Sequence, residues 1–557
     1  MIGHLLCEDN RLFQEPGEEC AAIAAGPGPG CSIMTFQTGR NAVALAGVCL
    51  ASLLFGLEIS SVPVILPTLE TALKADFKDL QWIMNAYTIA CTTVLMATGT
   101  LADRFGRKRV MIITTIAFAL ASLICGLAQG ALVLIIARFL QGLAGGAMLL
   151  CTVAVLSHQF QEGAERGRAF TAWGIVSGVG LGFGPLIGGL IVSLSNWQWV
   201  FLIHVPLAVV ALLLVGIGVR ESRDPQAKRI DLAGIVTLSL AVFGFSYLIT
   251  QGADLAPGMR WGVAAVAIVA FVAFLAAEKV SPHPMFDFSV FRIRQFSGAI
   301  MGCIGMNFSY WPFIIYLPIY VSSGLGYDAT QAGLLLLAYT LPFMVGPPLG
   351  EALRRRYQAR IAIPLGLMTI GVGFIAMKIG AGVEGANWLT LLPGLLIAGL
   401  GIGITSTPTT NTTTASVSAD RAGMASGIDI SARLITLAIN IAVMGLVLVE
   451  GIRASLQASL GAALATEELR TLAEKVAAGN LVSLTQDVPK LAGADPSGTL
   501  VHAALVDGFE LVMLYGGIGV IVLAILSYLI FGSGQTQTMG KAEREVAPSP
   551  AVALKGE

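Results

Sequence analysis

The sequence predicts an all-α polytopic membrane protein. Of its 557 residues, 55% are hydrophobic and only 12% are charged, and the mean hydropathy is +0.79, whereas soluble domains carry roughly a quarter charged residues. A helix needs about 20 mainly apolar residues to cross a bilayer, so this length leaves room for more than a dozen crossings. The apolar runs are continuous, which argues against the alternating strands of a β-barrel. A soluble enzyme is excluded.

Fourteen apolar runs are long enough to cross a membrane, and short polar segments separate them. An even number of crossings places both termini on one side. The runs fall at 43–66, 80–102, 110–129, 131–156, 169–193, 198–219, 231–252, 260–278, 297–322, 331–350, 361–379, 388–410, 422–449 and 508–532.

The positions of the basic residues predict the orientation. Lys and Arg gather in the loops on the side of the termini, as in the runs 104–109 and 354–360, whereas the other side carries few, such as Lys74 and Lys78. Because cytoplasmic loops are enriched in Lys and Arg, we expect both termini to lie in the cytoplasm, with the chain in the cytoplasmic (inner) membrane. The net charge of −1 does not indicate a nucleic-acid partner.

Three segments lie outside the crossings. Residues 1–42 are polar and rich in Gly and Pro, without the pattern of a signal peptide, and we expect a disordered cytoplasmic tail; Met34 is an alternative start. Residues 533–557 form a cytoplasmic C-terminal tail. The outside loop 453–507 contains Thr466–Ala478, whose apolar residues have helical spacing. This amphipathic helix predicts a lid or cap, with docking of an adaptor protein as the alternative.

The sequence shows neither a nucleotide-driven motor nor a metal site. A phosphate-binding loop needs GxxxxGK[ST], but the Gly-Lys pair at 540–541 is followed by Ala542. Energy must therefore come from an ion gradient, from the solute gradient or from a separate subunit, and no cofactor is expected. The eight cysteines include no CxxC pair and are interpreted as small, mostly buried thiols.

Three strings, in order along the chain, carry more specific information. After the second crossing, GTLADRFGRKR places a carboxylate and arginines where two helices turn, and such groups can latch helix ends in one conformation and release them in another. The fourth crossing contains ARFLQGLAGG from residue 137. The fifth has glycines that let helices approach closely and a proline that bends the helix. The candidate latch residues are Gly99, Asp103, Arg104, Gly106 and Arg107, and the fifth-crossing residues are Gly180, Gly184, Pro185, Gly188 and Gly189.

These strings resemble the signature loop, the R-x-x-Q-G-x-G motif and the antiporter motif of the major facilitator superfamily. Together with fourteen crossings and the segments 57–67, 82–87 and 196–206, they resemble its fourteen-helix drug:proton antiporter branch, the multidrug efflux type. The chain departs from that branch at Glu58, where Asp is usual, at Gln198, where Arg is usual, and at His204, where Asn is usual.

The resemblance implies the major facilitator fold, with two six-helix bundles rocking about a central site. The bundles are 43–219 and 297–532, and 231–278 forms two extra transmembrane helices. It also implies export of small amphiphilic or cationic organic compounds against proton entry, so that the partners are a small-molecule substrate, protons and the lipid bilayer. Alternatives are a dedicated exporter of one metabolite or siderophore, the membrane component of a multi-protein efflux complex, and a passive channel, against which the antiporter string argues.

Two ionisable residues lie at the same depth in the bilayer, where each costs at least about 2.5–3.5 kcal/mol. Glu58 and Arg138 stand roughly 10–12 Å from the outer ends of their crossings at about 1.5 Å per residue. If the helices are neighbours, as the resemblance implies, the two can pair. Burial favours the neutral carboxyl group and a nearby guanidinium favours the carboxylate, so moving Arg138 would load and unload a proton on Glu58. A static pair that fixes packing is the alternative.

The thirteenth crossing holds a second candidate pair, Asp429 and Arg433, four residues apart on a polar face. Thr436 and Asn440 extend that face, which favours a cavity-lining proton or substrate site over a self-neutralised pair. Aromatic and amide side chains elsewhere can bind apolar or cationic compounds. The candidate substrate-lining residues are Tyr87, Gln141, Trp173, Asn307, Trp311 and Asn440.

Overall fold

The computed structural model describes residues 29–160, 163–223, 231–252, 255–281, 288–417, 422–461, 463–479, 481, 484 and 491–532, and these form helices and no strands. The predicted all-α class is confirmed. The helices are α1 (Pro29–Ser61), α2 (Leu66–Leu73), α3 (Phe77–Phe105), α4 (Arg107–Gly126), α5 (Ala131–Gln159), α6 (Gly163–Leu194), α7 (Gln198–Leu202), α8 (His204–Gly218), α9 (Leu232–Gln251), α10 (Pro257–Val280), α11 (Arg294–Phe308), α12 (Tyr310–Ile319), α13 (Ala329–Thr340), α14 (Pro342–Tyr357), α15 (Ala359–Ala381), α16 (Trp388–Ala415), α17 (Ala422–Leu460), α18 (Thr466–Ala478), α20 (Leu491–Ala494) and α21 (Thr499–Phe531).

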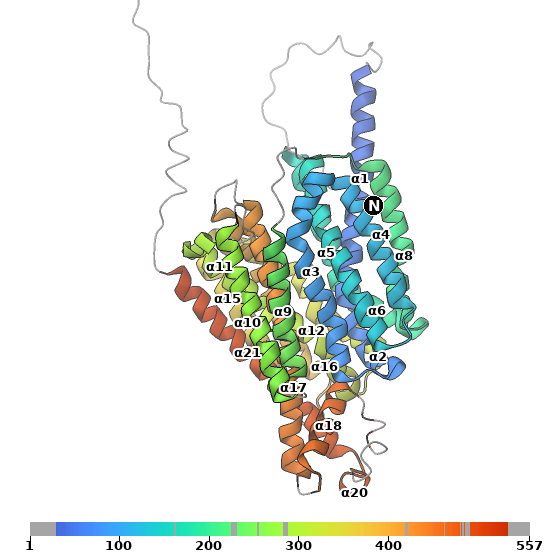
Figure 1. Ribbon diagram of the computed structural model, residues 1–557, viewed down its shortest axis with the longest axis vertical. Coiled ribbons are helices and arrows are strands. Elements are labelled where there is room, and N and C mark those ends of the chain that lie inside the picture. Colours follow the sequence, from blue (N-terminus) through green and yellow to red (C-terminus); the bar gives the residue numbers. More distant parts are fainter. Residues whose placement is uncertain are drawn as a thin grey trace, which may run out of the picture.

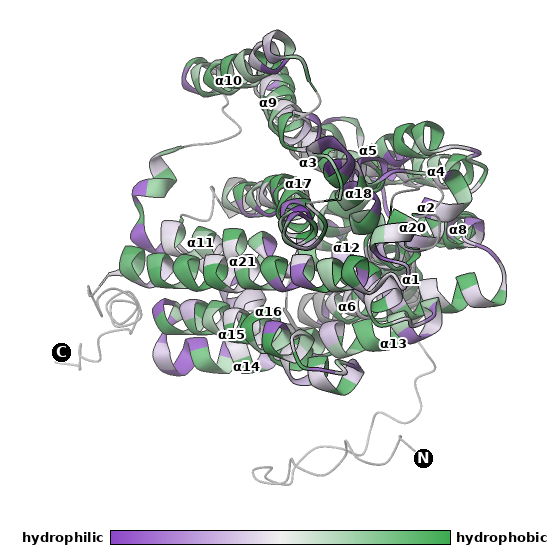
Figure 2. Ribbon diagram, turned by 90° about the horizontal axis from the view of Figure 1, so that it is seen from below, coloured by the Kyte–Doolittle hydropathy of each residue, from purple (hydrophilic) through white to green (hydrophobic). Residues whose placement is uncertain are grey.

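The described residues include 13 helical segments that are long and apolar enough to cross a membrane. Thirteen predicted crossings coincide with them, and the remaining one, 80–102, lies within α3, a helix of 29 residues. Large apolar side chains such as Leu132, Leu213 and Val269 are exposed on the outside of the bundle, where the helices are coloured as hydrophobic (Figure 2). A surface of this kind is compatible with lipid rather than water, so the chain is a multi-pass membrane protein.

The helices pack in two groups. In the N-group, α1–α8, helix α1 contacts α5, α6 and α8, and α5 contacts α3 and α4. In the C-group, α11–α21, helix α15 contacts α16 and α21, and α17 contacts α11 and α21. The extra pair, α9 and α10, stands at the edge of the bundle, where α9 contacts α3 and α17 (Figures 1 and 2).

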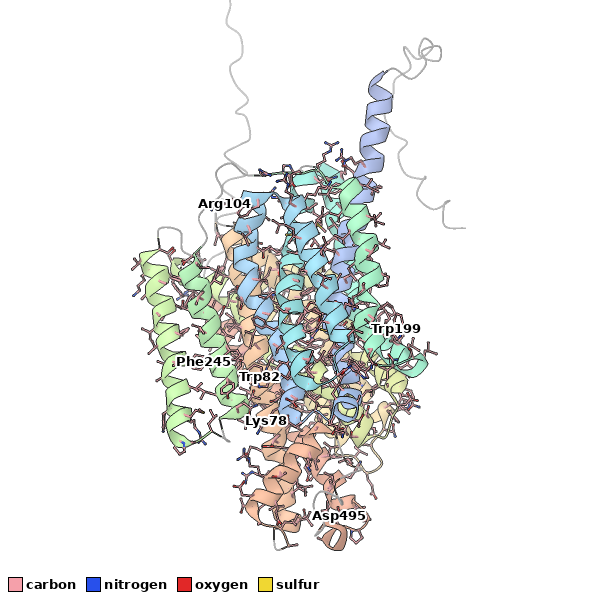
Figure 3. The ribbon with its side chains drawn as sticks, turned by 45° about the vertical axis from the view of Figure 1, so that its right-hand side comes forward. Lys78, Trp82, Arg104, Trp199, Phe245 and Asp495 are labelled. Atoms are coloured by element: carbon pink, nitrogen blue, oxygen red, sulfur yellow. The ribbon has the colours of Figure 1, made fainter. Side chains whose placement is uncertain are left out.

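The chain forms a cap at one end of the bundle (Figure 1). Helix α17 runs to Leu460 and α21 begins at Thr499, so both are longer than the predicted crossings. Between them α18 spans Thr466–Ala478, as predicted, and buries its apolar face. We call this end the cap end and the opposite end, where Arg104 lies, the loop end (Figure 3).

Proline interrupts two of the crossings. Helix α11 ends at Phe308 and α12 begins at Tyr310, and Pro312 cannot donate a backbone hydrogen bond to the preceding turn. The helix is therefore interrupted within this crossing. Near the end of the first crossing, Pro63 opens a short 3-10 turn, Val62–Ile65, that connects α1 to α2.

The N-terminal tail is shorter than expected. Helix α1 begins at Pro29, so residues 29–42 are helical rather than disordered. Proline suits the first turn of a helix because its missing N–H would have no partner there. No helix breaker follows between residues 31 and 38. Residues 1–28 and 533–557 lie outside the described part of the chain.

Candidate functional site

A buried acid–arginine pair joins two helices of the N-group. Glu58 lies on α1 and Arg138 on α5, and both are fully buried. One guanidinium nitrogen of Arg138, Nη1, donates a hydrogen bond to Oε1 of Glu58. The structure therefore brings together the two residues that the depth argument paired. An unpaired charge is costly in this environment, and here the two charged side chains lie in direct contact.

Two further side chains hold Arg138 in place. Its Nη1 also donates to Oε1 of Gln141 at 2.7 Å, and the amide of Gln141 donates to the hydroxyl of Ser122 at 2.8 Å. The guanidinium lies 4.3 Å from the ring centroid of Tyr87, within the range of a cation–π interaction. Gln141 and Tyr87 are candidate substrate-lining residues, and in this conformation both are buried against Arg138.

His204 completes this cluster from the first residue of α8. Its Nε2 lies 3.4 Å from Oε2 of Glu58, the oxygen that Arg138 does not occupy. The ring packs edge-on against Phe118, with the two ring centroids 5.8 Å apart. His204 is 1% exposed, and neither of its ring nitrogens has a hydrogen-bond partner in the structure. From the sequence, His204 stood out only because Asn is usual at this position in the fourteen-helix antiporter branch. Its contact with Glu58 was not predicted.

A second cluster surrounds Asp429 in the C-group. Arg433, one turn further along α17, donates its Nε–H to Oδ2 of Asp429 at 3.0 Å. Cys303 of α11 donates to Oδ1, and Thr410 of α16 contacts both members of the pair. Asp429 is 2% exposed, whereas Arg433 is 20% exposed through its side chain. The pairing within α17 was predicted, but Cys303 and Thr410 were not.

The remaining candidate substrate-lining residues contact groups other than the pair of Glu58 and Arg138. Asn440 donates to the carbonyl of Thr436 and accepts from Tyr515 of α21 at 2.9 Å, so its amide faces the interior of the C-group. Asn307 is buried and donates to the carbonyl of Cys303. Trp311 is half-buried, as is Trp173, whose indole N–H donates to Thr152 at 3.1 Å.

The glycines of the antiporter motif bring three helices together. Gly180, Gly184 and Gly188 form a stripe against α1. A methyl group on Gly188 would lie 2.8 Å from the carbonyl oxygen of Ser61, and one on Gly180 would lie 3.0 Å from that of Leu53. On another face of α6, a methyl group on Gly189 would lie 2.3 Å from the carbonyl oxygen of Ala329 in the C-group. The motif thus sets the distance of α6 from α1 and from α13.

Pro185 belongs to the same junction. Its carbonyl oxygen lies 2.8 Å from the position that a methyl group on Gly333 of α13 would take. Gly182 lies about one turn before Pro185 in α6, and its carbonyl accepts a hydrogen bond from the hydroxyl of Thr340 at 2.7 Å. Proline and glycine in α6 therefore allow close contact between the two helix groups.

The signature loop is organised by a carboxylate that sequence reasoning missed. Glu221, beyond α8, accepts the backbone N–H groups of Lys108 and Arg109 at 3.1 and 3.2 Å, at the start of α4, where a negative charge is favourable. Gly106 has a φ of +108°, and a methyl group there would lie 2.6 Å from Glu221. Only glycine meets both demands.

The other candidate latch residues are placed only in part. Arg107 donates its backbone N–H to the carbonyl of Ser222, and Arg104 lies over the ring of Phe105. Gly99 and Asp103 lie on α3, but their surroundings are outside the described part of the chain. Among the described residues, no group of three or more His, Cys, Asp or Glu side chains could hold a metal ion.

Two comparisons with known sequences agree with the architecture. A family model described as the Major Facilitator Superfamily matches residues 48–439. The chain is 30% identical over 410 residues to the multidrug resistance protein Stp of Mycobacterium tuberculosis (strain CDC 1551 / Oshkosh), covering 72% of this chain and 75% of that protein. It is 26% identical over 546 residues to the tetracenomycin C resistance and export protein of Streptomyces glaucescens, covering 93% of this chain and 95% of that protein.

The fold is also found among solved structures. A bacterial homologue of the human lysosomal transporter Spinster superposes with a TM-score of 0.61 and 15% sequence identity. The superposition covers 92% of this chain and 99% of that chain.

Proposed function

This chain belongs to the Major Facilitator Superfamily, and from that membership we propose that it exports small amphiphilic or cationic organic compounds in exchange for protons. The family consists of transporters rather than enzymes, so no catalytic residue is assigned. The relatives in the comparison are named for multidrug resistance and for resistance to and export of an antibiotic, which supports efflux of drug-like compounds.

The buried pair of Glu58 and Arg138 carries the proposal of proton coupling. A carboxylate and a guanidinium inside the bilayer are costly unless they pair, so their presence points to a function. While Arg138 contacts Glu58, the carboxylate is favoured; when Arg138 withdraws, a buried carboxyl group favours a proton. A change in the distance between α1 and α5 would therefore release or take up a proton at Glu58. The proton gradient would supply the energy for export.

Asp429 is proposed as a second proton or substrate site. It is buried and its carboxylate is shared by Arg433, Thr410 and Cys303. Arg433 retains some exposure, so the cluster has one charged group at its accessible edge. This arrangement supports a site at which a substrate that contacts Arg433 could weaken its ion pair with Asp429.

We place the protein in the cytoplasmic membrane, with the loop end and both termini in the cytoplasm. Basic residues concentrate at the loop end, which contains the runs 104–109 and 354–360, and cytoplasmic loops are enriched in Lys and Arg. The cap then lies outside the cell. Its helix α18 buries its apolar face against the protein, and Glu474 pairs with Lys78 of α3 at 3.5 Å. These contacts favour a cap over a free docking surface for an adaptor.

Transport is proposed to proceed by rocking of the N-group against the C-group, which correspond to the expected bundles 43–219 and 297–532. At the cap end the groups contact each other directly: Gln81 of α3 donates to Tyr316 of α12 at 3.0 Å, and Ser193 of α6 contacts Thr330 of α13 at 2.6 Å. Opening toward the outside requires these contacts to break. The contacts of the signature loop at the loop end, and the close approach of α6 to α1 and α13, would then stabilise the state in which they form.

The test is proton movement caused by substrates. Inside-out vesicles are energised with a pH gradient, and a panel of cationic dyes and other amphiphiles is added. Transported compounds should dissipate the gradient in the wild type, and Glu58→Gln should abolish the response without reducing the amount of protein in the membrane. Glu467→Gln, which changes an exposed carboxylate of α18, is the matched control. An unchanged response in Glu58→Gln would rule out Glu58 as the coupling acid.

Export of a single compound is the second candidate function. The relative that matches over 93% of this chain is named for export of one antibiotic, tetracenomycin C. In the vesicle assay, a response to several unrelated amphiphiles would support multidrug efflux. A response to none of them, together with an intact response to one natural product, would support the dedicated exporter.

A further inference from the structure

The carboxylate of Glu58 faces two different basic side chains, and the proposed function uses only one of them. Oε1 accepts from Arg138, while Oε2 is buried without a hydrogen bond and lies 3.4 Å from Nε2 of His204. This separation exceeds an ordinary N–H···O distance by a few tenths of an ångström. Arg138 and His204 approach different oxygens of the same carboxylate. Either of them can therefore be the positively charged partner of Glu58.

We propose that His204 shares the transported proton with Glu58. When Arg138 withdraws from Oε1, a proton entering the cluster binds Nε2 of His204, and the resulting imidazolium replaces Arg138 as the counter-ion of Glu58. The N–H bond forms as the O–H bond of the incoming hydronium ion breaks, and the proton can then pass from Nε2 to Oε2 of Glu58. On release of the proton, Arg138 returns. This inference rests on the proposed role of Glu58 and specifies where the proton resides.

The charge balance of the cluster explains why the two cations compete. With a neutral imidazole, Glu58 and Arg138 cancel; with an imidazolium as well, the cluster carries one uncompensated positive charge inside the bilayer, which is costly. The cost is relieved when Arg138 moves away or when the ring loses its proton. Histidine suits this exchange because its unperturbed ring changes charge between about pH 5 and 8.

The surroundings of His204 contain few other groups that titrate. Glu58 of α1 lies beside the ring, and Arg138 of α5 contacts Glu58 rather than His204. The thiol of Cys125 on α4 contacts Gln141, and the phenol ring of Tyr87 on α3 lies against Arg138. The ring of Phe118 also packs against the imidazole. Within the part of the chain that the structure describes, Glu58 is the carboxylate that pairs with His204 and can stabilise a charged ring.

The first experiment compares variants in the vesicle assay across about pH 5–8. His204→Asn, which introduces the residue usual in the resembling branch, should lose substrate-induced proton movement and its pH dependence while still binding a fluorescent substrate. His158→Asn, at the loop end of α5, should keep both. A wild-type pH profile in His204→Asn, together with a lost response in Glu58→Gln, would overturn the role of His204 and leave that of Glu58 standing.

The second experiment observes the ring directly and does not depend on a variant of His204. The other four histidines, His4, His158, His283 and His502, are replaced by Gln, and the protein is labelled with 15N-histidine. The ring nitrogen signals should show proton uptake within about pH 5–8, and this transition should leave the range in Glu58→Gln, because the carboxylate that favours the charged ring is gone. A ring that stays neutral at every pH where the protein transports would overturn the proposal.

Discussion

Gly445 of α17 faces Gln81 of α3 so closely that a methyl group on Gly445 would lie 1.6 Å from the amide nitrogen of Gln81. That amide also donates to Tyr316, whose hydroxyl in turn donates to the carbonyl of Ile441. The absence of a side chain at one position of the C-group thus allows a side chain of the N-group to reach two of its helices. This is a contact that outward opening has to break.

Gly445→Ala should weaken the contact between the groups at the cap end. The methyl group displaces the amide of Gln81 and comes within 2.6 Å of the hydroxyl of Tyr316, so the hydrogen bond between them is lost. We expect a larger fraction of molecules open at the cap end, measured as a longer spin-label distance between the exposed positions Lys74 and Glu467.

The matched variant is Gln81→Ala, which removes the same hydrogen bond without adding a methyl group at Gly445. Its distance distribution should shift in the same direction as that of Gly445→Ala. Identical distributions in Gly445→Ala and the wild type would show that this close approach does not control opening.

Gly188→Ala should destabilise the protein and slow transport. The new methyl group meets the backbone of Ser61 at 2.8 Å, so α6 and α1 have to separate, and overpacking of this kind costs about 1–3 kcal/mol. Thermal unfolding in detergent and the vesicle assay measure the two effects. Gly178→Ala, on the same helix with nothing within 4 Å of its new methyl group, should be neutral in both assays. Equal effects of the two substitutions would refute the packing role of the motif.

Gln141→Leu should weaken the hold on Arg138. Arg138 loses one acceptor and Ser122 loses its donor, and unsatisfied buried polar groups cost about 1–3 kcal/mol. We expect a lower unfolding temperature and a weaker proton response. Ser122→Ala leaves the contact between Gln141 and Arg138 intact and should keep the response; a stronger loss in Ser122→Ala than in Gln141→Leu would contradict this view of Gln141 as a positioning residue.

The role of the Asp429 pair can be separated from its effect on folding. Asp429→Asn or Arg433→Gln alone leaves a buried or half-buried charge without its partner, and breaking a buried pair costs about 3–5 kcal/mol. The double variant leaves no such charge and should express better than either single variant. We expect it to lose part of the proton response all the same. If it responds like the wild type, the pair is self-neutralised and serves folding alone.

The sequence was sufficient for the crossings because bilayer thickness imposes a length and a composition on each helix. Equal depth allowed Glu58 and Arg138 to meet, and the family resemblance implied that their helices are neighbours; the two together predicted this contact. It did not reveal His204 as a partner, because that contact depends on how the first turn of α8 lies against α1 and α5. For the same reason, it did not reveal that Asn440 accepts a hydrogen bond from Tyr515 of α21.

The extra pair of helices has a mechanical consequence. Helix α9 is tied to the N-group by the hydrogen bond from Ser239 to Thr93, at 3.0 Å, and by the rings of Phe243 and Tyr247, which pack against Trp82. Toward α17 it presents the apolar side chains of Leu238 and Val242. Hydrogen bonds are directional, whereas apolar contacts are not, so displacement of α9 relative to α17 breaks no directional bond that the structure shows between their described residues. Helices α9 and α10 would therefore move together with the N-group, while the C-group changes its position relative to them.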